Sequence, residues 1–131
     1  MRTFASCLAF LLLTACNRRS DAPSAEDVRL SRAVAGTWRV ERSNLIGVLT
    51  FQPDGSYSGF WSNQVRPKGW RFDGEWKIVN GSIVQKLKHA TYWNYTNDVV
   101  LDQEASYKIS HVDDHELQTT NDPEIKWTRT N

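Results

Sequence analysis

The chain has 131 residues, with 16 Lys and Arg against 15 Asp and Glu, so its formal net charge at pH 7 is +1. This length fits one small domain rather than two. The charges are balanced and the sequence has no block of basic residues, which argues against nucleic acid as a partner.

The first residues predict an export signal. Arg2 precedes an apolar run from Phe4 to Leu13, and the small residues Thr14 and Ala15 follow it. A positive start, a short apolar core and small residues before the cut are the features of a secretory signal. The run is shorter than the ~20 residues that a membrane-spanning helix needs. We therefore expect a signal peptide over residues 1–15.

The end of this leader resembles a known processing site. Leu13-Thr14-Ala15-Cys16 is similar to the bacterial lipobox, in which the cysteine becomes the acylated first residue of the mature protein. The resemblance implies palmitate-type acyl chains on Cys16 and a firm membrane anchor. Asn17 is not the aspartate that retains lipoproteins in the inner membrane of enteric bacteria. The resemblance therefore implies a place in the cell envelope, on the outer membrane and facing the periplasm.

An ordinary signal peptide cut near Ala15 is the alternative, and it would leave a free thiol at Cys16. Both cysteines of the chain, Cys7 and Cys16, lie in this leader. The mature domain is therefore expected to have no disulfide, although an exported protein could form one.

Residues 16–34 are expected to form a flexible tether that starts at the lipidated cysteine. The stretch from Asn17 to Leu30 is polar and has almost nothing to bury. A short helical turn over residues 27–35 is expected to lead into the domain, with three possible apolar contacts: Val28, Leu30 and Val34.

The globular domain is expected over residues 35–131, and its clearest pattern predicts a strand. Over residues 70–78, apolar or small residues at even positions alternate with charged residues at odd positions. This alternation is typical of a strand with one buried face. Gly74 lies on that face, which predicts a bend or the close approach of a neighbouring ring. Asn80-Gly81 follows and predicts a hairpin, so residues 83–88 should return antiparallel.

Other turn signals divide the rest of the domain. They lie at Gln52–Gly55, Val112–His115 and Asn121–Pro123, between runs rich in β-branched and aromatic residues. The further strands are expected over residues 36–42, 45–51, 56–61, 91–101 (less regular), 106–111, 116–120 and 124–128. About eight short strands and no long helix predict an all-β fold, a small antiparallel meander barrel without unpaired edges.

Four segments resemble the short lipocalin-like domains of bacterial lipoproteins: Gly36-Thr37-Trp38, the hairpin from Leu49 to Tyr57, Gly74–Ile78 and Lys126–Arg129. In lipocalins the Trp of Gly-x-Trp closes one end of the barrel, and a late Arg packs across its ring. The resemblance implies that Trp38 is this plug and that Arg129 caps it, with the guanidinium stacked on the indole.

The six tryptophans predict either a ligand pocket or an aromatic core. An eight-stranded barrel is wide enough to be filled by side chains or to hold one small ligand. Large rings also fill space in a domain without disulfides, so both interpretations stay open. The candidate ligand-binding residues, several of them near expected strand ends, are Trp61, Trp70, Trp93, Tyr57 and Tyr95.

Two segments are candidates for contact with another protein. The polar and cationic loop over residues 63–69 is longer than a typical hairpin turn. Residues 92–95 place aromatic rings beside an amide, a composition found in recognition surfaces. The alternatives are a solvated connection for the first segment and an ordinary strand of mixed polarity for the second.

The sequence predicts neither catalysis nor a metal site. It has no Gly-x-Ser-x-Gly elbow, phosphate loop or His-Glu-x-x-His motif. Five polar residues crowd one turn: His111, Asp113, Asp114, His115 and Glu116. The pair His111 and His115 straddles an expected β-turn, so the two rings need not converge, and a third metal ligand has no predictable position. We expect a polar turn there, no catalytic residue and no cofactor.

These features predict a lipid-anchored envelope protein whose barrel binds a small apolar or amphipathic ligand. The alternative is a module that binds another envelope protein, such as an inhibitor or immunity protein against a cell-wall hydrolase, or a structural component of an envelope complex. The free volume inside the barrel distinguishes the small-ligand hypothesis from the protein-partner hypothesis. A cavity of ~300 Å³ or more favours a small ligand, whereas a filled interior favours a protein partner.

Overall fold

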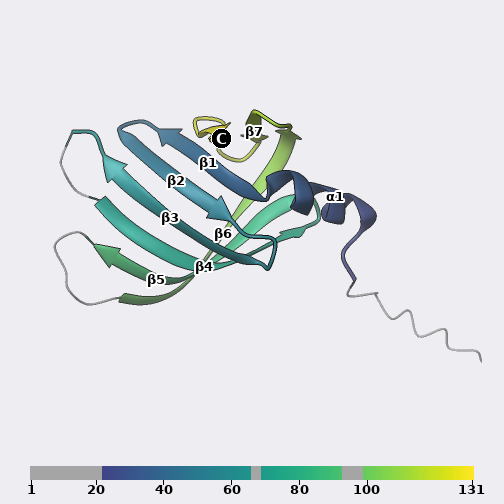
Figure 1. Ribbon diagram of the computed structural model, residues 1–131, viewed down its shortest axis with the longest axis horizontal. Helices are drawn as coiled ribbons and strands as arrows, with labels where there is room; N and C mark the ends of the chain where they lie inside the picture. The colour runs from purple at the N-terminus through teal and green to yellow at the C-terminus, as the bar shows by residue number, and fades with distance from the viewer. Residues whose placement is uncertain (1–21, 66–68, 93–98) are drawn as a thin grey trace, which may run out of the picture.

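The described part of the chain folds into one helix and a closed barrel of eight antiparallel strands (Figure 1). The computed structural model describes residues 22–65, 69–92 and 99–131. Each strand pairs with the next in the sequence, and the first strand also pairs with the last. The predicted eight-stranded meander barrel is confirmed. No helix in these ranges is long and apolar enough to span a membrane.

The elements follow one another along the chain with short connections. They are α1 (Ala25–Val34), β1 (Gly36–Arg42), β2 (Leu45–Phe51), β3 (Ser56–Asn63), β4 (Gly69–Val79), β5 (Ser82–Tyr92), β6 (Val99–Val112), β7 (Glu116–Thr119) and β8 (Lys126–Arg129). The bounds of β1 and β2 agree with the predicted strands.

The prediction of separate strands over residues 91–101 and 106–111 was wrong. Residues 99–112 form the single strand β6, and residues 91–92 are the end of β5. The two strands pair from Ser82 opposite Lys108 to Ala90 opposite Val99, with an irregularity between Leu87 and His89. This long ladder, although irregular at one point, extends both strands well beyond the segments whose sequence shows a clear strand pattern.

The turn between β4 and β5 has the predicted hairpin geometry. Asn80 and Gly81 have φ angles of 50° and 72°, the left-handed conformation that a two-residue type I′ turn requires at both positions.

The expected close approach of a neighbouring ring at Gly74 is confirmed, and the ladder is irregular there. The β4–β5 ladder shifts register between Asp73 and Gly74. A Cβ atom at Gly74 would overlap the backbone oxygen of Lys86 and would lie 2.8 Å from Cε1 of Tyr57. The absent side chain thus makes room for a neighbouring strand and a neighbouring ring.

Helix α1 covers one end of the barrel (Figure 1), and it begins two residues before and ends one residue before the helical segment expected over residues 27–35. The last ten residues of the expected tether, 25–34, are therefore helical. Ser24 caps the helix, because its hydroxyl accepts a hydrogen bond from the Asp27 amide at 3.0 Å. Leu30 and Val34 are buried in the core as expected. Val28 is 37% exposed and is not part of the buried core.

A buried carboxylate ties α1 to the barrel. Asp27 is 6% exposed and shares the inner face of the helix with Leu30 and Val34. Its carboxylate accepts hydrogen bonds from the backbone amides of Asn80 at 3.0 Å and Gly81 at 2.9 Å. Charge-assisted bonds of this kind are stronger than neutral ones. The helix is therefore held against the β4–β5 turn as well as against the core.

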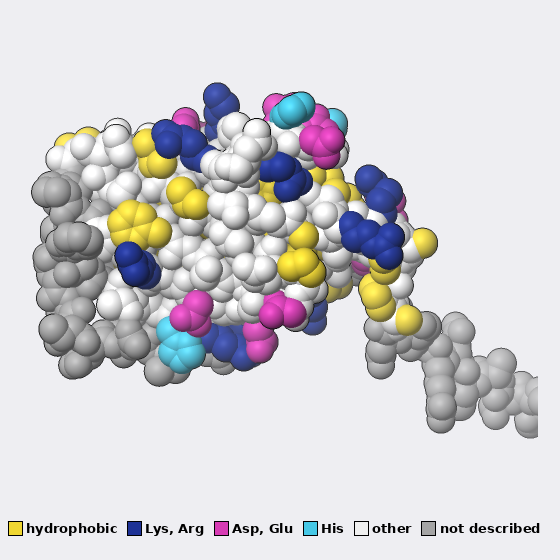
Figure 2. Space-filling model, viewed as in Figure 1, with side chains coloured by type: hydrophobic (Ala, Val, Ile, Leu, Met, Phe, Trp, Pro, Cys, Tyr) yellow, Lys and Arg dark blue, Asp and Glu magenta, His cyan; other side chains and the backbone are white. Residues whose placement is uncertain are grey.

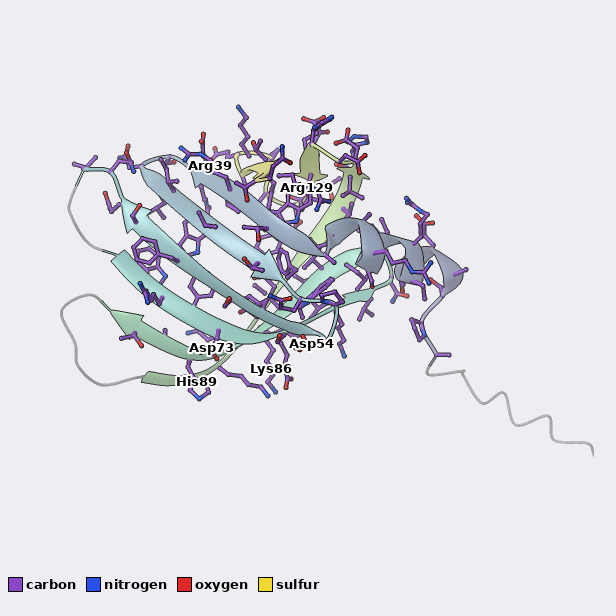
Figure 3. The ribbon with its side chains drawn as sticks, viewed as in Figure 1. Arg39, Asp54, Asp73, Lys86, His89 and Arg129 are labelled. Atoms are coloured by element: carbon purple, nitrogen blue, oxygen red, sulfur yellow. The ribbon has the colours of Figure 1, made fainter. Side chains whose placement is uncertain are left out.

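Trp38 and Arg129 are in contact where α1 meets the barrel. Arg129 is labelled in Figure 3. Trp38 is completely buried, and its indole N–H donates to the Val34 oxygen at 2.8 Å. The guanidinium carbon of Arg129 lies 4.2 Å from the centroid of the Trp38 ring. Arg129 also donates to the backbone oxygens of Ala33, at 2.5 Å, and Ala35, at 3.0 Å. The contact that the lipocalin resemblance implied is present.

Replacing Trp38 by alanine should destabilise the protein by about 3–5 kcal/mol, because it opens a cavity in the closed end and removes the surface under Arg129. Urea unfolding followed by circular dichroism measures the change. The matched control is Trp70→Ala, which removes the same ring from a half-buried position and should cost less. A loss of under about 1 kcal/mol for Trp38→Ala would exclude the plug role.

Candidate ligand site in the barrel

The barrel interior is filled with aromatic rings on the side that α1 covers. Phe51 contacts Trp76 and Trp127, with ring centroids 5.1 and 6.3 Å apart, and Tyr107 meets Trp127 edge-on at 5.9 Å. The indole N–H of Trp76 donates to the Gln52 oxygen at 2.8 Å. For these rings the core interpretation holds.

A small cavity lies toward the other end of the barrel, near the end of β3 and the start of β4. Its volume is about 190 Å³. The cavity, here called the cup, is lined by side chains of four strands: Tyr57, Trp61, Trp70, Phe72, Gln85, Leu87, Gln103, Glu104 and Ala105. Three of the five predicted ligand-binding residues, Tyr57, Trp61 and Trp70, are thus brought together.

Two stacked indoles form one wall of the cup. Trp61 on β3 is the cross-strand partner of Trp70 on β4. Their ring centroids are 6.4 Å apart and the ring planes differ by 25°. Gly47 makes room for this arrangement, because a Cβ atom there would lie 2.8 Å from the Trp61 ring. Both indoles are half-buried and keep accessible apolar surface.

Tyr57 lies deeper in the cup and is 3% exposed. Its ring centroid is 6.0 Å from that of Phe72. Desolvation by burial raises the pKa of Tyr57 to about 12, with Tyr107 and Asp73 adding to the shift. The phenol therefore stays neutral across the physiological pH range.

Gln85 is a functional candidate that sequence reasoning missed. It lines the cup, it is 7% exposed, and its side-chain nitrogen Nε2 is buried without a hydrogen-bond partner. Leaving a buried polar group unpaired costs roughly 1–3 kcal/mol. The available signal was the alternation along β5, where Gln85 takes an inward position between buried Ile83 and partly buried Leu87.

Other predicted residues lie away from the cup or cannot be placed. Trp38 and Arg129 are together at the α1 end. Cys16, Trp93 and Tyr95 lie outside the described residues, as do residues 66–68 of the loop expected over 63–69. The cup falls below the ~300 Å³ at which drug-sized ligand pockets begin. The interior is thus neither widely open nor completely filled.

The turn between β6 and β7 is organised by Asp113. One carboxylate oxygen accepts hydrogen bonds from the backbone amides of His115 at 2.7 Å and Glu116 at 2.8 Å. The other lies 2.9 Å from Nε2 of His111. The bond with His111 first, and then the two amide bonds, hold the pKa of Asp113 well below its usual range. His111, Asp113 and Glu116 offer possible ligand atoms within 4.8 Å of one another, and all three are exposed.

The outer face of the sheet carries a second hollow, over β2 to β5. Val48 is 43% exposed. The ring of Phe60 packs over Gly69, because a Cβ atom built at Gly69 would lie only 2.7 Å from Cζ of Phe60. Asp73 and His89 face each other at 2.9 Å on the same surface (Figure 3). Apolar side chains are visible beside basic ones on this face of the molecule (Figure 2).

Compared with known proteins, the chain matches no protein-family model and no curated protein sequence. The lipobox and the lipocalin resemblance therefore stay predictions from the sequence.

The environment of Tyr57 predicts its titration. The neutral phenol stabilises the fold, and this contribution is fully present below pH 10 and is lost as the pH rises from about 10 to about 12. Tyrosinate absorbance of the native protein minus that of Tyr57→Phe should give one group that titrates near pH 12. The variant should also lose less stability over this interval. Ionisation of Tyr57 near pH 10, with native circular dichroism retained, would contradict its burial.

Proposed function

We propose that this chain is a lipid-anchored envelope protein whose lipocalin-like barrel binds a small apolar or amphipathic ligand in the cup. One observation carries the proposal: a barrel filled at one end keeps a cavity farther along, with a stacked indole pair and a buried, unpartnered amide on its walls. Ligand sites are concave, mostly apolar and supplied with a few polar groups.

The lining of the cup suits an amphipathic molecule. Trp61, Trp70 and Phe72 present aromatic surface, whereas Gln103 and Glu104 are exposed polar residues at its edge. An apolar part would rest against the rings, and a polar part would face these side chains or water. Aromatic rings give a large contact area to a ligand of this kind.

The expected anchor is compatible with an accessible cup. The segment that follows Cys16 joins α1, which covers the filled end of the barrel. The indole pair belongs to the last part of β3 and the first part of β4, and these strand ends lie away from α1 (Figure 1). A protein held to a bilayer through Cys16 would therefore be attached on the side that does not bind.

Binding of another envelope protein is the second candidate function, and the outer face favours it. Phe60 and Val48 form an apolar patch beside Arg71 and the Asp73–His89 pair. An apolar patch with charged neighbours is a common composition of protein interfaces. The hydrolase inhibitor, the immunity protein and the structural component named above would all use such a face.

Ligand binding predicts saturable changes in tryptophan fluorescence when the full chain is titrated with fatty acids, phospholipids, sugars and small aromatic compounds. Trp70→Leu should weaken the binding of an active compound by about tenfold, because it removes one indole of the stacked pair. Phe60→Leu is the control on the outer face and should leave that affinity unchanged.

The absence of saturable binding across these compounds would defeat the proposal. Specific capture of one periplasmic protein by the native chain, lost in Phe60→Leu and retained in Trp70→Leu, would then favour the second candidate function.

The anchor has its own test. Cys16→Ala should move the protein from the membrane fraction to the soluble fraction, because the variant has no thiol to acylate. The domain should still fold, since residue 16 precedes α1. Fractionation of cells that express the native chain or the variant measures this. Membrane association that persists in Cys16→Ala would mean that the chain is held by something else.

A further inference from the structure

Gln85 places a hydrogen-bonding group in the floor of the cup. Its neighbours on the adjoining strands are Trp76 and Ala105, one a large ring and the other a single methyl group. The amide is 7% exposed, and Nε2 has no partner. A primary amide carries two N–H donors and one carbonyl, and half a turn about its last bond exchanges them. Gln85 can therefore offer an N–H to a molecule in the cup.

The size of the cup limits what can enter. Its volume is about 190 Å³. An apolar cavity of ~150 Å³ accommodates benzene. The cup therefore has room for one ring with a short substituent, and it is too small to enclose a long acyl chain. The flat indoles of Trp61 and Trp70 favour a planar ring over a branched one.

The charges around the cup favour a neutral molecule. Among the described residues that line it, none is Lys, Arg or His. A carboxylate in the cup would lose its hydration without meeting an opposite charge on these described lining residues. Glu104 is the charged residue of the lining, but it is exposed and its cross-strand neighbour is Lys86. A cationic ligand is therefore not favoured either.

We infer that the cup selects a small, uncharged, planar ring compound with a carbonyl oxygen, which accepts a hydrogen bond from the amide of Gln85. The inference rests on the proposed function, since it names the class of ligand for the same site. Gln85 is then the specificity-determining residue, while the indoles supply contact area that any ring would share.

Two probes of nearly equal shape test this inference: acetophenone, which has a carbonyl beside its ring, and ethylbenzene, which has a methylene there. Each is titrated into the full chain, purified in a nonionic detergent, with partition into the detergent measured in protein-free blanks. The signals followed by NMR are the indole N–H groups of Trp61 and Trp70 and the side-chain amide of Gln85.

The native protein should bind acetophenone about fivefold or more tightly than ethylbenzene. Gln85→Leu and Gln85→Met should abolish this preference and leave ethylbenzene bound as tightly as before or more tightly. Both variants should be at least as resistant to heat as the native protein, because they remove a buried amide without a partner. Phe60→Leu should keep the preference.

The two proposals fail in different ways. If both probes shift the indole signals with equal affinity, or if the preference survives in both Gln85 variants, the role of Gln85 is wrong while ligand binding in the cup stands. If neither probe shifts the indole signals, ligand binding in the cup is wrong as well.

Discussion

The contact between Arg129 and Trp38 is the interaction on which the rest of this structure depends. It joins the last strand to the first at the point where the barrel closes, and the same guanidinium holds the backbone oxygens of Ala33 and Ala35. Trp38 in turn donates to Val34. One cation thus links the two ends of the sheet with the end of α1. The three elements are held together there by these polar contacts and by the packed aromatic rings of the closed end.

A firmly packed end allows the remainder of the interior to be packed less completely. Asp27 and the Asn80–Gly81 turn hold the helix over the filled side, and the rings around Phe51 occupy the space below it. Toward Trp61 and Trp70 the interior keeps a cavity and an amide without a partner. The cavity reduces stability, so its position away from the packed end is consistent with a binding site supported by a stable base.

The parts of the fold that were predictable have strong local signals. The alternation along β4 and the Asn80–Gly81 turn depend on neighbours in the sequence, and both predictions are confirmed. The junction of β5 and β6 was predicted wrongly, because pairing between distant residues extends these strands beyond any local pattern. The helical segment before the first strand was predicted to within two residues at each end, but the way it is held to the barrel was not predicted. The short apolar face of the helix stabilises it only when that face is buried against the barrel. Asp27 is also hydrogen-bonded to a turn more than fifty residues away.

The sequence by itself determined the class of fold and the positions of most turns, since these follow from side-chain alternation and backbone conformation, while the contact between Trp38 and Arg129 was implied by the lipocalin resemblance. It also offered Tyr57, Trp61 and Trp70 as three of five ligand-binding candidates, but it left open whether these rings line a pocket or fill the core. Only the tertiary structure decided which rings fill the core and which line a cavity, and it alone brought Gln85 to the floor of that cavity. The physical reason is that free volume, and the absence of a partner for a buried amide, depend on strands distant in the sequence, which a local pattern does not record.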